Sequence, residues 1–230
     1  MLEITWLGHG TFQFRLETGE VVVLDPWLDG PTYPKGHQFT RIDAILVTHG
    51  HFDHIHSVVP LAKKFSAPVA AIYELCHWLE SKGVSTTCPM NKGGSQQIGP
   101  LTLTMTDAVH SCGILDDGNI LYGGEAAGFI IGLPDGRKIY FAGDTNVFTD
   151  MQLIAQIYQP ELAFLPIGDL FTMSPREAAV ACRLLRVKKV IPKHYGTFPP
   201  LTGQPAQLAA LIHGLDTKVW PLDIGKPVSW

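Results

Sequence analysis

Three histidines and one aspartate fall within the six-residue segment His49-Gly50-His51-Phe52-Asp53-His54. Imidazole nitrogens and carboxylate oxygens are protein groups that bind divalent transition metals. The aliphatic run from Asp43 to Val47 predicts a strand before this segment, and the run from Ser57 to Phe65 predicts a helix after it. A turn between them would give the side chains varied directions, and Gly50 would let the backbone bend. These residues predict a metal site, rather than a solvated histidine-rich loop.

Three further candidate ligands follow predicted strands later in the chain. Leu101 to Thr106 alternates apolar residues with threonine, as a strand with one buried face does, and it ends shortly before His110. Asp144 follows a hairpin predicted around the turn Pro134-Asp135-Gly136, and His194 follows a short aliphatic strand. A lone residue of this type is more often a hydrogen-bonded loop residue, but the histidine cluster favours a ligand role for all three.

The periodicity elsewhere indicates a mixed α/β protein. Ser174-Pro175-Arg176-Glu177 is a capping box with proline at the first helical position, so it predicts a helix from Pro175 to about Arg186. A second helix is predicted over 205–214. Strands are predicted at 4–7, 12–16, 21–24, 128–133, 137–142, 189–192 and 218–222. No linker-like stretch divides the chain, so we expect one domain over residues 1–230.

The composition narrows the class of protein. A chain of 230 residues with 46% hydrophobic residues can bury a substantial core. Its net charge of −4, without a long basic run, argues against binding to nucleic acid or to anionic membranes. The four cysteines lack C-x-x-C spacing, which favours reduced, mostly buried thiols. With no signal-peptide pattern at the N-terminus and no apolar run of membrane-spanning length, we expect a cytoplasmic protein.

H-x-H-x-D-H after a strand, followed in order by His110, Gly143-Asp144-Thr145 and His194, resembles the metallo-β-lactamase-fold superfamily along nearly the whole chain. Three further segments resemble its stand-alone metal-dependent hydrolases related to ascorbate-6-phosphate lactonases: Leu7-Gly8-His9-Gly10-Thr11-Phe12, Pro166-Ile167-Gly168-Asp169 with Thr172-Met173, and His194-Tyr195-Gly196-Thr197. The resemblance implies a four-layer αβ/βα sandwich, an α/β (α+β) fold, with two metals in a groove at one edge of two sheets.

The resemblance also implies how the ligands divide. One metal would be held by His49, His51 and His110, the other by Asp53, His54 and His194, with Asp144 bridging both. Two divalent ions about 3.5–4 Å apart can share a water and lower its pKa, so that a metal-bound hydroxide is the nucleophile. Asp53, His54 and Asp144 would be the catalytic residues, and Asp53 could orient the hydroxide or protonate the leaving group. The nitrogen and oxygen ligands favour Zn or Mn, with Fe or Ni as alternatives.

Several other polar residues have two interpretations each. His9 either contacts a ligand or the substrate, or is a structural histidine, and Asp25 either orients a ligand histidine or forms a turn. Asp169 either faces the groove or stabilises its loop. Tyr195 either donates to a substrate oxyanion or packs against the core. His56 stands where the superfamily often has glycine, and it could add a polar contact near the site.

The predicted function is metal-dependent hydrolysis of a small ester, lactone or phosphodiester. Mononuclear iron oxygen or persulfide chemistry and glutathione-thioester hydrolysis are alternatives, because those branches use the same ligand order. Diiron redox relatives typically carry glutamate where His51 stands, which argues against that class. We expect a small-molecule substrate, and a homo-oligomer stays open as an alternative. The segments expected to line the groove are 31–39, 88–97 and 113–124.

Overall fold

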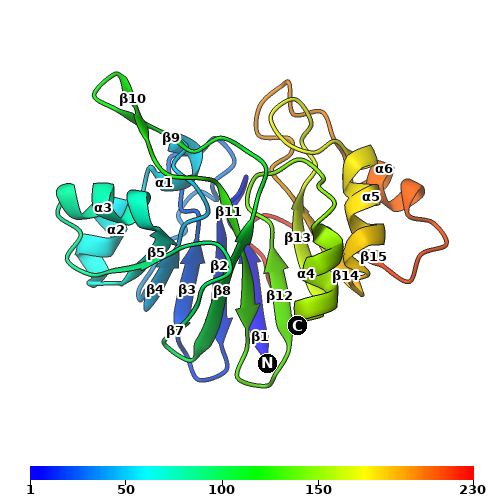
Figure 1. Cartoon of the computed structure of the whole chain (residues 1–230), viewed down its shortest axis with the longest axis horizontal. Coiled ribbons are helices and arrows are strands. Elements are labelled where there is room, and N and C mark those ends of the chain that lie inside the picture. Colours follow the sequence, from blue (N-terminus) through cyan, green and yellow to red (C-terminus); the bar gives the residue numbers. More distant parts are fainter. The chain divides into compact units, whose positions relative to one another are not determined.

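Two seven-stranded sheets, one in each of two compact units, carry the fold (Figure 1). The computed structural model describes residues 1–230. Unit 1 consists of Met1–Asn91, Ser111–Glu125 and Leu222–Trp230, and unit 2 consists of Lys92–His110 and Ala126–Pro221. Both sheets mix antiparallel and parallel strands, which confirms the mixed α/β class. None of the helices has the length and hydrophobicity that a membrane span requires.

The sheet of unit 1 has the strand order β16-β1-β2-β3-β4-β5-β6. Neighbours from β16 to β3 are antiparallel and those from β3 to β6 are parallel. The hairpin predicted around Thr18-Gly19 is confirmed, because Phe12 pairs with Leu24. The strands are β1 Leu2–Trp6, β2 Phe12–Leu16, β3 Val21–Leu24, β4 Ala44–Leu46, β5 Val69–Ile72, β6 Thr87–Met90 and β16 Pro227–Ser229.

Three helices and one extra hairpin complete unit 1. The helices are α1 Phe52–Ile55, α2 Val58–Phe65 and α3 Tyr73–Ser81. The prediction of α2 is confirmed, since it buries Val58, Leu61 and Ala62. The strands β9 Gly113–Asp116 and β10 Asn119–Tyr122 form a hairpin that extends away from the rest of unit 1 (Figure 1). All four residues of β10 are exposed.

The sheet of unit 2 has the strand order β15-β14-β13-β12-β11-β8-β7. Neighbours from β7 to β12 are antiparallel, and those from β12 to β15 are parallel. The hairpin predicted around Pro134-Asp135-Gly136 is confirmed by the pairing of β11 with β12. The strands are β7 Ser95–Ile98, β8 Leu101–Asp107, β11 Ala127–Gly132, β12 Lys138–Phe141, β13 Leu162–Pro166, β14 Lys189–Lys193 and β15 Lys218–Val219.

Three helices accompany this second sheet: α4 Met151–Tyr158, α5 Pro175–Leu185 and α6 Pro205–Leu211. The capping box of α5 is confirmed, because the Ser174 hydroxyl accepts from the backbone N–H of Glu177 while the Glu177 carboxylate accepts from that of Ser174. The apolar face of α5 then joins the core of unit 2, in which Ala178, Ala179 and Cys182 are buried with Tyr140 of the sheet.

The structure departs from the sequence expectations in three places. The strand β8 is not buried on one face alone, because Thr104 and Thr106 are buried as well. The segment 88–97, expected to be a loop, contributes residues to β6 and β7. The periodicity did not predict β5, α3, α4 or β13. Every residue of β5 and β13 is buried, as in parallel strands covered on both faces, and α3 begins directly after β5 without a capping side chain.

Candidate metal centre

The histidine segment of unit 1 lies between β4 and α2, as predicted, but its second half forms the short helix α1, which the sequence did not predict. The strand β4 ends at Leu46, and the helix α1 begins one residue after His51. This places Asp53 in the first helical turn and leaves the side chains of His49 and His54 fully buried. Because the backbone changes from extended to helical within this segment, its side chains point in different directions.

The ligand atoms of this segment form two close sets. His49 Nε2 lies 3.0 Å from His51 Nδ1. Two nitrogens on one tetrahedral zinc would lie about 3.3 Å apart, given Zn–N distances of about 2.0–2.1 Å. In the second set, Asp53 Oδ2 lies 3.8 Å from His54 Nε2. The family resemblance implies the same division of these four residues between two metals, and that division stays a prediction. Their nitrogen and oxygen donors fit a divalent transition metal.

Asp25 and Thr48 determine which nitrogen of each buried histidine carries its proton. Asp25 Oδ2 lies 2.9 Å from His54 Nδ1 and accepts from the Thr48 hydroxyl at 2.8 Å. Because that hydroxyl donates to the carboxylate, it accepts from His49 Nδ1, 3.0 Å away. Both imidazoles therefore hold their proton on Nδ1 and present the Nε2 lone pair, the arrangement that a metal ligand requires.

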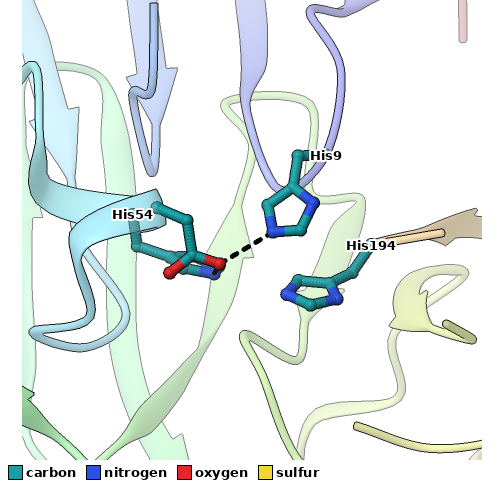
Figure 2. A group of neighbouring side chains, drawn as sticks. His9, His54 and His194 are labelled. Atoms are coloured by element: carbon teal, nitrogen blue, oxygen red, sulfur yellow. Dashed lines mark hydrogen bonds and ion pairs between the residues drawn. The ribbon is translucent and has the colours of Figure 1, made fainter. Parts of the chain in front are cut away.

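His9 contacts the predicted ligand Asp53. Its Nε2 lies 2.8 Å from Asp53 Oδ2, as the dashed line in Figure 2 marks. The ring is buried, with its centroid 5.3 Å from that of Trp27. The flanking glycine Gly10 is needed for space, because a Cβ there would lie 2.8 Å from His54 Cε1. The His9 motif thus packs directly against the histidine segment.

Cys112 also supports the segment, and no motif in the sequence indicates this role. The backbone N–H of Gly50 donates to Cys112 Sγ at 3.2 Å, and the thiol donates to the carbonyl of Gly123 at 3.1 Å. A Cβ on Gly50 would lie 2.7 Å from Ile114 Cγ1. Ser111 Oγ also lies 3.2 Å from His51 Nε2. The residues before and within β9 therefore hold the turn in place.

In unit 2, Asp144 and His194 follow two strands that flank β13, and their side chains contact each other. Asp144 comes after β12 and His194 after β14. Asp144 Oδ2 lies 2.8 Å from His194 Nε2, and Asp144 Oδ1 accepts from Lys193 Nζ at 2.9 Å. All three side chains are buried. Lys193 was not among the predicted site residues, and its position directly beside the candidate ligand His194 is the signal that could have indicated it.

The segment of His110 is tied to the segment of Asp144 by backbone contacts. Val109 N–H donates to Thr145 Oγ1 at 3.0 Å, and Asn146 N–H donates to the Val109 carbonyl at 3.3 Å. His110 itself is partly buried. The residues that directly follow β8 and β12 are thereby held together within unit 2.

The remaining candidates, Asp169, Tyr195 and His56, make contacts outside the sets described above. Asp169 is exposed, and its Oδ1 accepts from the backbone N–H of Leu170 at 2.8 Å, so it stabilises its own loop. Tyr195 is partly buried and packs against the core of unit 2. His56 is exposed, with Nδ1 3.5 Å from an oxygen of Asp29. The contacts of Asp169 and Tyr195 fit their structural interpretations, and the roles of all three residues at the site stay predictions.

Comparisons with known proteins agree with this architecture. The family described as a beta-lactamase superfamily domain matches residues 20–195. A UPF0173 metal-dependent hydrolase of Solibacter usitatus is 68% identical over 230 residues, covering 100% of both chains. One from Koribacter versatilis is 47% identical over 217 residues, covering 94% of this chain and 93% of the relative.

Solved structures show the same fold. Igni18, described as a novel metallo hydrolase from Ignicoccus hospitalis, has a TM-score of 0.87 at 31% identity, covering 99% of this chain and 97% of its own. An isothiocyanate hydrolase from Delia radicum gut bacteria has a TM-score of 0.73 at 18% identity, covering 99% and 98%, and shares the fold alone. The chain belongs to the beta-lactamase superfamily and, within it, to the UPF0173 metal-dependent hydrolases.

Proposed function

We propose that this chain hydrolyses a small ester, lactone or phosphodiester with two divalent ions, Zn or Mn, bound by seven residues. The ligands would be His49, His51, Asp53 and His54 of unit 1 and His110, Asp144 and His194 of unit 2. The two units would then act as one hydrolase domain over residues 1–230. The observation that carries this proposal is the Asp25–Thr48 network. It engages Nδ1 of the buried residues His49 and His54, which leaves the Nε2 lone pair of each ring to bind a metal.

Three residues would take part in the chemistry: Asp53, His54 and Asp144. A bound metal pair would lower the pKa of a shared water and polarise the bond to be cleaved. Asp53 is suited to hold a proton of the attacking water or to pass one to the leaving group, because it is slightly exposed and His9 fixes one of its oxygens. His54, held by Asp25, keeps a constant orientation.

The free cysteines support a reducing, cytoplasmic location. Cys76, Cys112 and Cys182 are buried thiols, Cys88 is partly buried, and none forms a disulfide, as predicted. Burial raises the pKa of both Cys76 and Cys182 to about 12, which keeps these thiols protonated and unreactive. A small-molecule substrate fits a site whose supporting side chains are mostly buried.

Metal analysis paired with hydrolysis assays tests the proposal. Purified protein is analysed for metals, then assayed with a phosphodiester, a lactone and a thioester after addition of Mn²⁺ or Zn²⁺. We expect about two ions per chain and turnover that EDTA abolishes. His51→Ala and Asp144→Ala should abolish turnover, while His77→Ala, at an exposed position, should not.

The outcomes separate the competing functions. One iron per chain without hydrolysis would support mononuclear iron chemistry instead. Turnover of the thioester alone would support the thioesterase alternative. Full hydrolysis by either ligand variant would contradict the ligand assignment.

A further inference from the structure

The ammonium group of Lys193 is buried beside a predicted metal ligand. The side chain is fully buried, its Nζ lies 2.9 Å from Asp144 Oδ1, and it lies 5.4 Å from the centroid of the Phe141 ring. A fully buried lysine is rare and costly unless it is paired. Lys193 lies outside the predicted ligand set, so a charged group at this depth requires another role.

Lys193 and His194 reach opposite oxygens of one carboxylate although they are neighbours in the chain. Consecutive residues of a strand point to opposite faces. Lys193 remains in the strand, where its carbonyl accepts from the N–H of Ile167 at 3.0 Å. His194 leaves the strand with a φ of 56°, which turns its ring toward Asp144. The ammonium thus takes Oδ1, and the imidazole faces Oδ2.

We propose that Lys193 is a positioning residue that restricts Asp144 to a single metal-binding oxygen and weakens the binding of the cation there. This inference rests on the proposed function. A lysine is suited to the task because it donates from one point, whereas the planar fork of an arginine would engage both oxygens. With Oδ1 held, Asp144 offers Oδ2 on the side of His194.

The charge of Lys193 sets the direction of its effect on affinity. Partners that accept a hydrogen bond from a ligand histidine increase its basicity and strengthen metal binding. Lys193 does the opposite, because it donates to a ligand carboxylate and places a positive charge near the cation. In return, it compensates the buried charge of Asp144 when no cation is bound.

Lys193→Met tests the charge, because it replaces the ammonium with an apolar group of similar length. Zn²⁺ is titrated into metal-free full-length protein by calorimetry, and Tm is measured with and without Zn²⁺. We expect one Zn²⁺ to bind about tenfold or more tightly than in wild type. Without metal, the Tm should be lower than that of metal-free wild type, and Zn²⁺ should restore most of the difference. Lys188→Met, at an exposed position on the same unit, is the matched control.

Lys193→Gln removes the positive charge but keeps a hydrogen-bond donor, so it separates the effect of the charge from the orientation of the Asp144 carboxylate. It also replaces the Met variant as the test if that variant does not fold. Its amide can still donate to Oδ1, so we expect tighter binding but a Co²⁺ absorption spectrum close to that of wild type. The Met variant should instead change the Co²⁺ spectrum, because Asp144 can then offer both oxygens.

Unchanged Zn²⁺ affinity and Co²⁺ spectra, with Tm lowered equally in metal-free and loaded proteins, would show that Lys193 is merely structural and overturn the inference. Wild-type protein that binds no divalent ion would overturn the proposed function and this inference together. Normal wild-type binding without an effect of Lys193 would overturn the inference alone.

Discussion

Asp25 Oδ2 lies 2.9 Å from His54 Nδ1, and both side chains are fully buried 29 residues apart in the sequence. The other carboxylate oxygen accepts from the backbone N–H of Thr48 at 2.8 Å. A buried carboxylate with this many donors is fully compensated, so it can serve as a fixed acceptor for the histidine. Asp25 follows β3 and Thr48 follows β4, so these contacts connect the ends of both strands to His54.

Asp25→Asn should weaken metal binding about 10- to 100-fold, because a neutral amide no longer fixes the proton of His54 on Nδ1. Competition with a chelating dye measures the affinity. Asp29→Asn, which alters an exposed carboxylate beside His56, is the control and should bind like wild type. Equal affinities in the Asp25 variant and the control would show that the network does not orient a ligand.

Gly10→Ala should displace His54 and lower metal affinity by about tenfold or more. The added Cβ would lie 2.8 Å from His54 Cε1, closer than van der Waals contact allows in a packed interior. Gly132→Ala is the matched control, since its Cβ would meet Thr102 at an ordinary 3.4 Å. The same chelator competition applies, and wild-type affinity in Gly10→Ala would refute the close packing at His54.

Cys112→Val should destabilise metal-free protein by about 1–3 kcal/mol, because the buried N–H of Gly50 and carbonyl of Gly123 lose their partner. Urea unfolding measures the difference. Cys112→Ser, whose hydroxyl can both accept and donate, should recover part of the loss. A serine variant as unstable as the valine variant would point to packing of the sulfur instead of its hydrogen bonds.

The attachment of the β9–β10 hairpin to α3 should weaken in acid. Asp116 accepts from Lys82 Nζ at 2.7 Å and from Trp78 Nε1 at 2.9 Å, and these hydrogen bonds lower its pKa. A carboxylate with a lowered pKa stabilises the folded state above its unfolded pKa of about 3.9. That contribution is lost as the pH falls through the lower folded pKa.

Hydrogen exchange of the hairpin amides at pH 6 and pH 3 measures this effect. We expect protection relative to intrinsic exchange rates to fall at pH 3 in wild type. Asp116→Asn should show reduced protection already at pH 6 and little further change. Identical pH dependence in both proteins would assign the effect to another group.

Elements with local signals could be predicted from the amino-acid sequence alone. The hairpin around Thr18-Gly19 follows from alternation and turn residues, and α5 follows from its capping box. The histidine segment could also be predicted from local sequence, because its candidate ligands lie within a few residues after a strand. Family membership followed from the order of the motifs, which needs no knowledge of contacts.

The residues that support the predicted ligands could be identified only from the folded chain. Asp25 with His54, His9 with Asp53 and Lys193 with Asp144 are separated by 29, 44 and 49 residues. The order of strands in each sheet brings such partners together, and periodicity within a single element carries no information about that order. The left-handed backbone of His194 is a second reason why the contacts of Asp144 could not be predicted from the sequence. It lets two consecutive residues reach one carboxylate, which strand alternation alone would forbid.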